Sequence, residues 1–273
     1  MRLRNVWVYA LGLTLAASVA ACGGGSTPAT TEAPGAAPAG AGQKVDPATA
    51  GNVTGMVVID GTAPKNDAIK MNADPFCAKA NTTPQSQESY MVGSDGKSLA
   101  NVFVYVKDGL GNYVFDTPTA TVTIDQKDCR YHPHVFGVRV GQELTITNSD
   151  STLHNIHALP KDNSEFNTAQ PMQTQPLGSI PPIKHKFDKA EIMVPFKCEV
   201  HGWMNAYVGV VSNPYFAVTE ADGKFSLKGL PPGTYTIDAW QEKLGDVTQS
   251  VTIAASETKD ITFTFKAPAA ATN

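Results

Sequence analysis

Four residues in the second half of the chain have side chains that could bind a redox-active metal ion. Cys198, His201 and Met204 stand in the segment PFKCEVHGWMNAYVGVV, where a loop with the spacing Cys-x2-His-x2-Met leads into an apolar strand. His154 lies upstream, just beyond the predicted strand ELTITN. One thiolate and two imidazoles form a trigonal ligand set, and a thioether can bind at a longer axial distance. The pattern predicts a type 1 site for one copper ion, held by these four residues.

These ligand types suit both oxidation states of copper, because thiolate and thioether favour Cu(I) and imidazole binds either state. Each residue also has a plainer interpretation. Cys198 could be a small buried hydrophobe, and Met204 could belong to an apolar core. Met193, inside the preceding strand, is a competing thioether. The occurrence of all four residues in this order at strand ends favours the copper site.

The elements that must position these ligands are β-strands. Apolar residues alternate or form short runs, separated by clusters of Gly, Pro, Asn and Asp, and no stretch keeps a helical period over three turns. The chain has 23 Gly and 19 Pro, a level typical of many short strands joined by turns. We therefore predict an all-β fold with strands in the following segments: 53–59, 101–106, 121–124, 143–147, 206–211, 234–239, 251–253 and 261–265.

Residues 118–213 resemble the cupredoxins, the family of plastocyanin and amicyanin. The resemblance rests on the segments TVTID, YHPHVFGVRVGQELTITNSDSTLHN and MVPFKCEVHGWMNAYVGVV, and the short ligand loop is closer to that of amicyanin. It implies a Greek-key β-sandwich that binds copper. It also implies that Asn155, after the first histidine, ties the two ligand loops together. Electrons would pass at the surface through His201 and Trp203.

A second resemblance concerns the segment TEADGKFSLKGLPPGTYTIDAW, which is similar to the carboxypeptidase regulatory-like domain, a small prealbumin-like β-sandwich. Residues 214–266 are short for such a sandwich, and residues 51–112 contain segments that resemble its opening strands. We therefore expect a discontinuous module, 51–112 with 214–266, into which the cupredoxin-like domain is inserted. Two consecutive domains or one fused sandwich are the alternatives. No zinc-protease motif HExxH occurs.

The first residues, 1–21, have the basic start and apolar run of a signal peptide. The run ends in Val-Ala-Ala-Cys, which resembles the lipobox of bacterial lipoproteins and predicts lipidation of Cys22. The alternative is an ordinary cleaved signal. Residues 22–50 are rich in Gly, Ala, Pro and Thr and are expected to be a flexible linker, and residues 267–273 a disordered tail. The fold would thus work on the periplasmic side of a membrane or at the cell surface.

The chain has four cysteines, so Cys77 and Cys129 remain after the lipid and copper assignments. In an oxidising compartment two such residues most often form a disulfide. The alternative is a second metal site made by Cys129, His132 and His134 with Cys77. The sequence leaves both possibilities open and favours the disulfide.

The charge balance and the cupredoxin resemblance together define the expected function. The formal net charge is −4, with no basic surface that would predict nucleic-acid binding. The resemblance implies an electron carrier, not an enzyme, with redox proteins and a membrane as partners and no small-molecule substrate. His132 and His134 form the only His-x-His pair of the sequence, whereas the trinuclear centre of a multicopper oxidase needs several, so that class is disfavoured. A copper nitrite reductase is also disfavoured, because too few histidines remain for a second copper site. Copper delivery and a structural envelope role are the alternatives.

Overall fold

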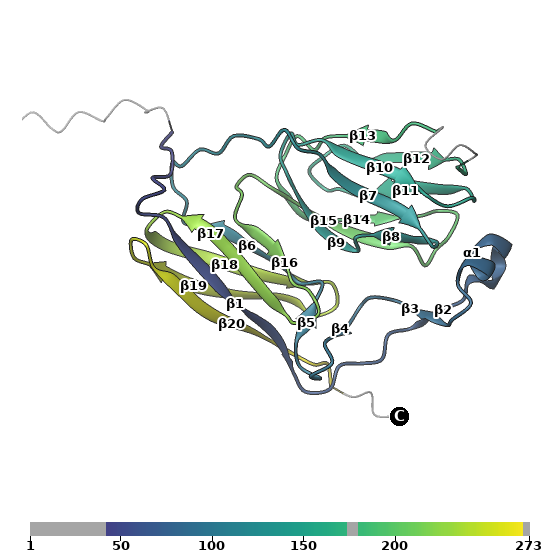
Figure 1. Cartoon of the computed structure of the whole chain (residues 1–273), viewed down its shortest axis with the longest axis horizontal. Coiled ribbons are helices and arrows are strands. Elements are labelled where there is room, and N and C mark those ends of the chain that lie inside the picture. The colour runs from purple at the N-terminus through teal and green to yellow at the C-terminus, as the bar shows by residue number, and fades with distance from the viewer. Residues whose placement is uncertain (1–41, 174–179, 270–273) are drawn as a thin grey trace, which may run out of the picture. The chain divides into compact units, whose positions relative to one another are not determined.

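The computed structural model describes residues 42–173 and 180–269, and strands dominate this part of the chain (Figure 1). Within these residues the single α-helix is α1 (Pro75–Ala80), preceded by the 3-10 helix η1 (Met71–Ala73). This arrangement confirms the predicted all-β fold. The expected signal peptide, Cys22 and most of the expected linker lie outside the described residues.

One sandwich is built from both ends of the described chain, and we call it the flanking sandwich. Its first sheet has the order β17 (Lys224–Leu230), β1 (Gly51–Asp60) and β20 (Thr258–Lys266). Its second sheet has the order β16 (Phe216–Val218), β6 (Phe103–Asp108), β18 (Gly233–Gln241) and β19 (Gly245–Ile253). Strand β1 is antiparallel to β17 and parallel to β20, between which it lies in Figure 1. Strands from the beginning and the end of the described chain therefore share both sheets.

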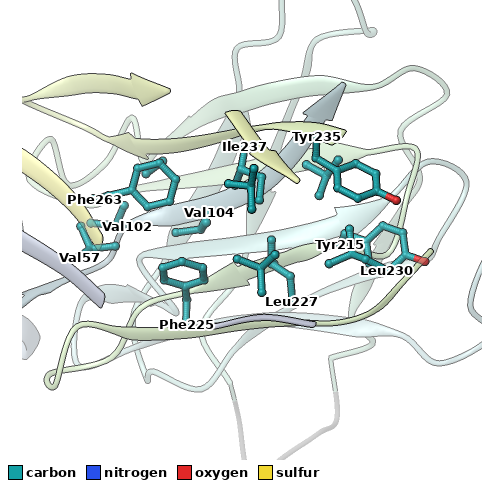
Figure 2. Close-up of a cluster of buried hydrophobic side chains, with 14 of the residues drawn as sticks. Val57, Val102, Val104, Tyr215, Phe225, Leu227, Leu230, Tyr235, Ile237 and Phe263 are labelled. Atoms are coloured by element: carbon teal, nitrogen blue, oxygen red, sulfur yellow. The ribbon is translucent and has the colours of Figure 1, made fainter. Parts of the chain in front are cut away.

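The core of the flanking sandwich follows from alternation along its strands. Residues of β1 alternate between buried and partly exposed, as expected of a strand with one face on a core. Val57 and Phe263 come from one sheet, and Val104 and Ile237 come from the other, and all four are fully buried. Figure 2 shows these side chains meeting between the sheets. Burial of this apolar surface is the main stabilising contribution to the module.

The second sandwich, which we call the inserted sandwich, holds the predicted ligands. One sheet has the order β13 (Ile183–His185), β10 (Leu144–Asn148), β7 (Val122–Lys127) and β8 (Arg130–His132). The other has the order β12 (Phe166–Gln170), β11 (His154–Ala158), β14 (Glu191–Lys197), β15 (Asn205–Val211) and β9 (Val135–Arg139). Its core is a separate cluster of buried side chains, which includes Cys198 and Met204. The predicted ligands thus belong to a sandwich with its own core.

Residues 66–90 leave the flanking sandwich and pack on the inserted one, and we call them the cap segment. Its base is closed by two hydrogen bonds, from Asn66 Nδ2 to the carbonyl of Tyr90 and from the Tyr90 N–H to Asn66 Oδ1. It contains η1, α1 and a short ladder of β2 (Ala68–Ile69) with β3 (Gln85–Ser86). The hairpin of β4 (Met91–Val92) and β5 (Leu99–Ala100) then returns the chain to β6. The predicted module included residues 51–112 without a break, so the packing of residues 66–90 on the other sandwich was not predicted.

The two sandwiches meet through an apolar joint of buried aromatic and aliphatic side chains. Phe103 stacks on Phe216 with ring centroids 5.6 Å apart, and Val135 and Met193 pack in the same cluster. A Cβ atom at Gly209 would lie 2.4 Å from the Phe103 ring, so glycine is required by the close approach. Met193, the competing thioether, is therefore a packing residue of this joint.

The ordered fold begins before the predicted boundary at residue 51. The Gln43 N–H donates to the carbonyl of Asn112, and the Ser256 N–H donates to the carbonyl of Thr49. Asp46 stabilises the turn in between, because its side chain accepts a hydrogen bond from the Ala48 N–H. The expected flexible linker is therefore wrong for residues 42–50. At the other end the Ala267 N–H donates to the carbonyl of Asp60, so that residue of the expected tail is paired.

Among the described residues, no helix combines the length and the apolar character that crossing a bilayer would require.

Candidate metal centre

The strands of the inserted sandwich deliver the predicted ligands to one place. His154 is the first residue of β11, and Cys198 follows directly on the last residue of β14. His201 and Met204 lie in the loop from β14 to β15. The Met204 N–H donates to the carbonyl of His201 (2.9 Å), and the Cys198 N–H donates to the carbonyl of Met204 (3.2 Å). These bonds fold the Cys-x2-His-x2-Met loop into a tight turn that directs its side chains inward.

The donor atoms of three predicted ligands converge in the interior. His154 Nδ1 lies 2.9 Å from His201 Nδ1, and Cys198 Sγ lies 3.9 Å from His201 Nδ1. The ligand atoms of these three residues all lie within 4.8 Å of one another. The exposed fraction is 0% for His154 and 2% for both Cys198 and His201. A thiol and two imidazole nitrogens therefore share one dry site.

Two carboxylates set the orientation of the imidazole rings. His154 Nε2 lies 2.8 Å from Asp150 Oδ2, and His201 Nε2 lies 3.0 Å from Asp74 Oδ2. A carboxylate on Nε2 orients the ring so that Nδ1 points to the opposite side, which is the usual arrangement around metal-binding histidines. Burial acts to lower the pKa of His154, but the hydrogen bonds of Asp150 and Cys198 outweigh it and the pKa is raised.

The surroundings of Cys198 favour the thiolate, which is the form that binds metals. Burial acts to raise the pKa of the Cys198 thiol, but hydrogen bonds from His154 and from backbone N–H groups outweigh it. Those N–H groups belong to Asn155, His201 and Val200, and the net pKa is lowered. The His201 N–H lies 3.4 Å from the sulfur. The polypeptide thus supplies hydrogen-bond donors that stabilise negative charge on this sulfur.

Asn155 lies between the two ligand segments, at the position where the cupredoxin resemblance implies a link. Its side-chain oxygen accepts a hydrogen bond from the Glu199 N–H, the residue after Cys198. Its carbonyl accepts a hydrogen bond from the hydroxyl of the buried Tyr131. Strand β11 and the ligand loop are therefore held in register by this residue.

Met204 is buried with an exposed fraction of 1%, in the core cluster that also contains Cys198. Its backbone is fixed by the loop hydrogen bonds, which leaves the side chain inside the inserted sandwich. The assignment of its thioether as the axial ligand stays a prediction. The competing thioether, Met193, packs in the joint with Phe103 and does not share a cluster with the ligands.

His201 does not reach the surface, and this finding corrects the implied electron-transfer edge. The cap segment covers it, because Asp74 binds Nε2 and Cys77 Sγ lies 3.7 Å from the same nitrogen. Trp203 is partly exposed, and its ring centroid lies 5.0 Å from that of His201. Its indole N–H donates to the carbonyl of Cys129 (3.0 Å). Of the two residues that the resemblance placed at the surface, only Trp203 has an exposed part.

Cys77 and Cys129 form a disulfide in the structure, between α1 of the cap segment and the turn from β7 to β8. Their sulfurs are bonded to each other, so they are not thiolate ligands of a second metal. His132 is exposed, whereas His134 is buried and lies 3.2 Å from Glu242 through Nε2. The alternative second metal site from these four residues therefore does not form.

Asp74 and Asp150 are the residues of the site that the sequence interpretation missed. The pair Asp74-Pro75 was a visible signal for a helix start, and Asp74 does cap α1 by accepting from the N–H groups of Phe76 and Cys77. Nothing in the sequence pattern connects this helix with a histidine far along the chain. Asp150 lies four residues before His154, in a turn that showed no recognisable motif.

The donor set fits copper. The Nδ1 atoms of His154 and His201 lie 2.9 Å apart in a buried space that also holds the Cys198 sulfur, whose pKa is lowered. Two imidazoles and a thiolate, with a thioether in the same core, are the ligand types of type 1 copper sites. Water is excluded from all of them. These residues can hold one copper ion.

Comparisons with known proteins give partial likenesses. A sequence model of the carboxypeptidase regulatory-like domain matches residues 204–266, which confirms the resemblance of the segment TEADGKFSLKGLPPGTYTIDAW to that domain. No curated protein matches the chain. Among solved structures, the chain is similar to a copper-containing nitrite reductase from Thermus scotoductus SA-01. The match has 16% identity and a TM-score of 0.30, and it covers 38% of this chain and 24% of the other. The chain thus spans about a quarter of that enzyme's length.

Two smaller proteins are matched over most of their own length. A reduced Cu(I) form of an amicyanin variant has 21% identity and a TM-score of 0.28, over 35% of this chain and 87% of the other. A purple cupredoxin from Nitrosopumilus maritimus has 22% identity and a TM-score of 0.27, over 33% of this chain and 99% of the other. The family match begins at Met204, so it takes in β15 of the inserted sandwich and leaves out β1 and β6.

Proposed function

We propose that this chain is a lipid-anchored type 1 copper protein that carries single electrons between redox partner proteins outside the cytoplasm. The observation that carries the proposal is the convergence of His154 Nδ1 and His201 Nδ1, 2.9 Å apart, beside the thiol of Cys198. Each ring is fixed by a carboxylate on its other nitrogen. The two Nδ1 atoms and the Cys198 sulfur thus meet at one buried point, which supports a shared metal ion.

His154, Cys198, His201 and Met204 would hold the copper ion, which would supply one-electron chemistry between Cu(II) and Cu(I). The protein's task is to keep the ligands in place in both states. Cys198, His154 and His201 stand on a hairpin and a strand whose hydrogen bonds do not depend on the metal. Their burial keeps water and other small ligands out, so no open position for a substrate remains. This arrangement supports electron transfer and not an enzymatic reaction.

The proposed location rests on the sequence. The Val-Ala-Ala-Cys segment at residues 19–22 supports lipidation of Cys22 after export, and the Cys77–Cys129 disulfide suits an oxidising compartment. The fold would then stay near a membrane through the lipid. The acidic balance of the chain favours partners with basic docking surfaces, whose association would weaken as salt is added.

Copper delivery needs ligands that a partner can reach, whereas His154, Cys198 and His201 are at most 2% exposed. The cap segment also covers the outer nitrogen of His201. Slow copper exchange is therefore expected. This burial is the reason that we favour a carrier over a delivery protein.

The test is a redox titration of the copper-loaded protein together with a chelator competition. A carrier gives a reversible one-electron potential and keeps its copper for hours in an excess of a strong chelator in both oxidation states. Rapid loss of copper to the chelator, with a site that does not cycle reversibly, would overturn the proposal in favour of delivery. Failure to bind copper at all would leave a structural role.

A further inference from the structure

The outer nitrogen of His201 is held by a residue from a different part of the chain. His201 Nε2 lies 3.0 Å from Asp74 Oδ2, and the two residues are 127 positions apart. Asp74 belongs to the cap segment, which arises from the flanking sandwich, whereas His201 belongs to the ligand loop of the inserted sandwich. The carboxylate therefore joins the cap segment to the site that is proposed to bind a metal.

The position of Asp74 is determined by several independent contacts. Its Oδ1 accepts hydrogen bonds from the N–H groups of Phe76 (2.7 Å) and Cys77 (3.1 Å) at the start of α1. Its Oδ2 accepts a hydrogen bond from the Thr152 hydroxyl (3.2 Å), next to the segment that carries His154. A carboxylate with this many donors has one orientation, and in that orientation Oδ2 meets His201.

The cap segment itself is fastened to the inserted sandwich on both sides of α1. The disulfide joins Cys77 to Cys129, and Asn81 Nδ2 donates to the carbonyl of Asp128 (3.1 Å). Gln87 Nε2 donates to the carbonyl of Trp203 (3.2 Å), which lies in the ligand loop. Met71 and Cys77 are buried against Cys129, with Trp203 packed on the same cluster. The cap segment is thus a fixed part of the site.

We propose that Asp74 is a positioning residue of the copper site: it fixes the ring of His201 with Nδ1 directed at the metal, and its charge stabilises Cu(II) relative to Cu(I). The inference rests on the proposed function. An anion on the outer nitrogen of a metal-binding imidazole favours the metal ion with the higher charge. The reduction potential of the site is therefore set partly by the cap segment, and a redox partner meets this segment before it meets His201.

Two substitutions separate the contact of Asp74 with His201 from its role as a helix cap. Asp74→Asn removes the charge and replaces Oδ2, the atom that meets His201, with an amide NH2 group, but it keeps an oxygen that can cap α1, because asparagine caps helices about as well as aspartate. Asp74→Ala removes the cap as well. Asp67→Asn is the matched control, since Asp67 is an exposed carboxylate of the same cap segment. All three variants are made in the exported full-length chain.

The first readout needs no copper. In the metal-free protein the Nε2 proton of His201 is expected to exchange slowly with water and to give a resolved signal in nitrogen-15 NMR of labelled histidine. The signal should be lost by fast exchange in Asp74→Ala and retained in Asp67→Asn. The double variant Cys77→Ser/Cys129→Ser should also accelerate exchange, because it releases the cap segment. Equal exchange in all variants would overturn the positioning role.

The second readout is the reduction potential of the copper-loaded protein. Asp74→Asn is expected to raise the potential, increasing the Cu(I) to Cu(II) ratio at a fixed applied potential about tenfold, which is about 59 mV for one electron. Asp67→Asn should leave it unchanged. If the reduction potential of Asp74→Asn equals that of the control, the charge of Asp74 does not stabilise Cu(II), and that part of the proposal is overturned. If the unmodified protein shows no thiolate–copper absorption, the proposed function fails, and the exchange measurement still decides whether Asp74 positions His201.

Discussion

His154 Nδ1 and His201 Nδ1 lie 2.9 Å apart, although the residues come from β11 and from the loop after β14. The contact exists because Asp150 and Asp74 hold the opposite nitrogens of the two rings. Both carboxylates come from outside the ligand loop. The geometry of the site is therefore a property of three segments of the chain, and the following predictions examine how each contributes.

Asp150→Asn is expected to lower copper affinity about 10- to 100-fold, the usual effect of removing a carboxylate behind a metal-binding histidine. Asp150 accepts hydrogen bonds from His154 Nε2 and from the Cys129 N–H, so the variant loosens the ring without removing a ligand. Competition with a chelator of known affinity measures the change. The control is Asp162→Asn, an exposed carboxylate elsewhere in the inserted sandwich, which should bind copper as the unmodified protein does. Equal affinities would contradict the role of Asp150.

Cys77→Ser/Cys129→Ser is expected to destabilise the fold by about 2–4 kcal/mol, because the disulfide restricts a long loop of the unfolded chain. The two cysteines are 52 positions apart. Urea unfolding of the variant, compared with the oxidised parent, measures the loss, and adding reductant to the parent should reproduce it. A midpoint that is insensitive to both treatments would show that the disulfide contributes nothing to stability.

Gly209→Ala is expected to destabilise the joint between the sandwiches by about 1–3 kcal/mol, the usual cost of overpacking. The added methyl group would lie 2.4 Å from the Phe103 ring and 2.7 Å from Met193 Cε. Gly202→Ala is the matched control, since a Cβ there meets no atom within 4 Å. Chemical denaturation of both variants tests the joint. An equal effect of the two substitutions would mean that the sandwiches are not packed this closely.

The Glu242 carboxylate is expected to contribute to the free energy of unfolding at neutral pH and to lose that contribution in acid. Burial acts to raise its pKa, but hydrogen bonds from His134 and Ser89 outweigh it, with Lys243 adding attraction, and the pKa is lowered from its usual 4.5. A lowered pKa in the folded state stabilises the protein above pH 4.5, and this contribution fades as the pH falls through the folded-state pKa. Urea midpoints measured from pH 7 to pH 3 should fall less steeply for Glu242→Gln than for the unmodified protein. If the urea midpoints of the two proteins fall equally with pH, Glu242 does not make this contribution.

Much of this architecture could be predicted from the sequence because it follows from local patterns. Alternation of apolar residues revealed β1, β15 and β18, and the run from Asp222 to Tyr235 identified the module that a family model also matches. The ligand set was recognisable because Cys198, His201 and Met204 lie close together on one loop. These features depend on residues a few positions apart, which a sequence displays directly.

The cap segment could not be predicted, because its role depends on contacts between residues far apart in the chain. Nothing around Asp74 indicates that its carboxylate meets His201, or that Gln87 meets Trp203. The expectation of a surface-exposed His201 was wrong for this reason: the resemblance described a sandwich without such a cover. The boundary at residue 51 was misplaced too, since the backbone bonds of Gln43 and Thr49 have no signature in composition.

A titration with Cu(II) under visible spectroscopy tests the central claim most directly. The unmodified protein is expected to develop an intense thiolate-to-copper band that saturates at one equivalent of Cu(II), and Cys198→Ser is expected to lack that band while keeping its fold. Asp162→Asn should titrate as the unmodified protein does. Absence of the band in the unmodified protein, or its persistence in Cys198→Ser, would contradict the assignment of Cys198 as the thiolate ligand of a type 1 copper site.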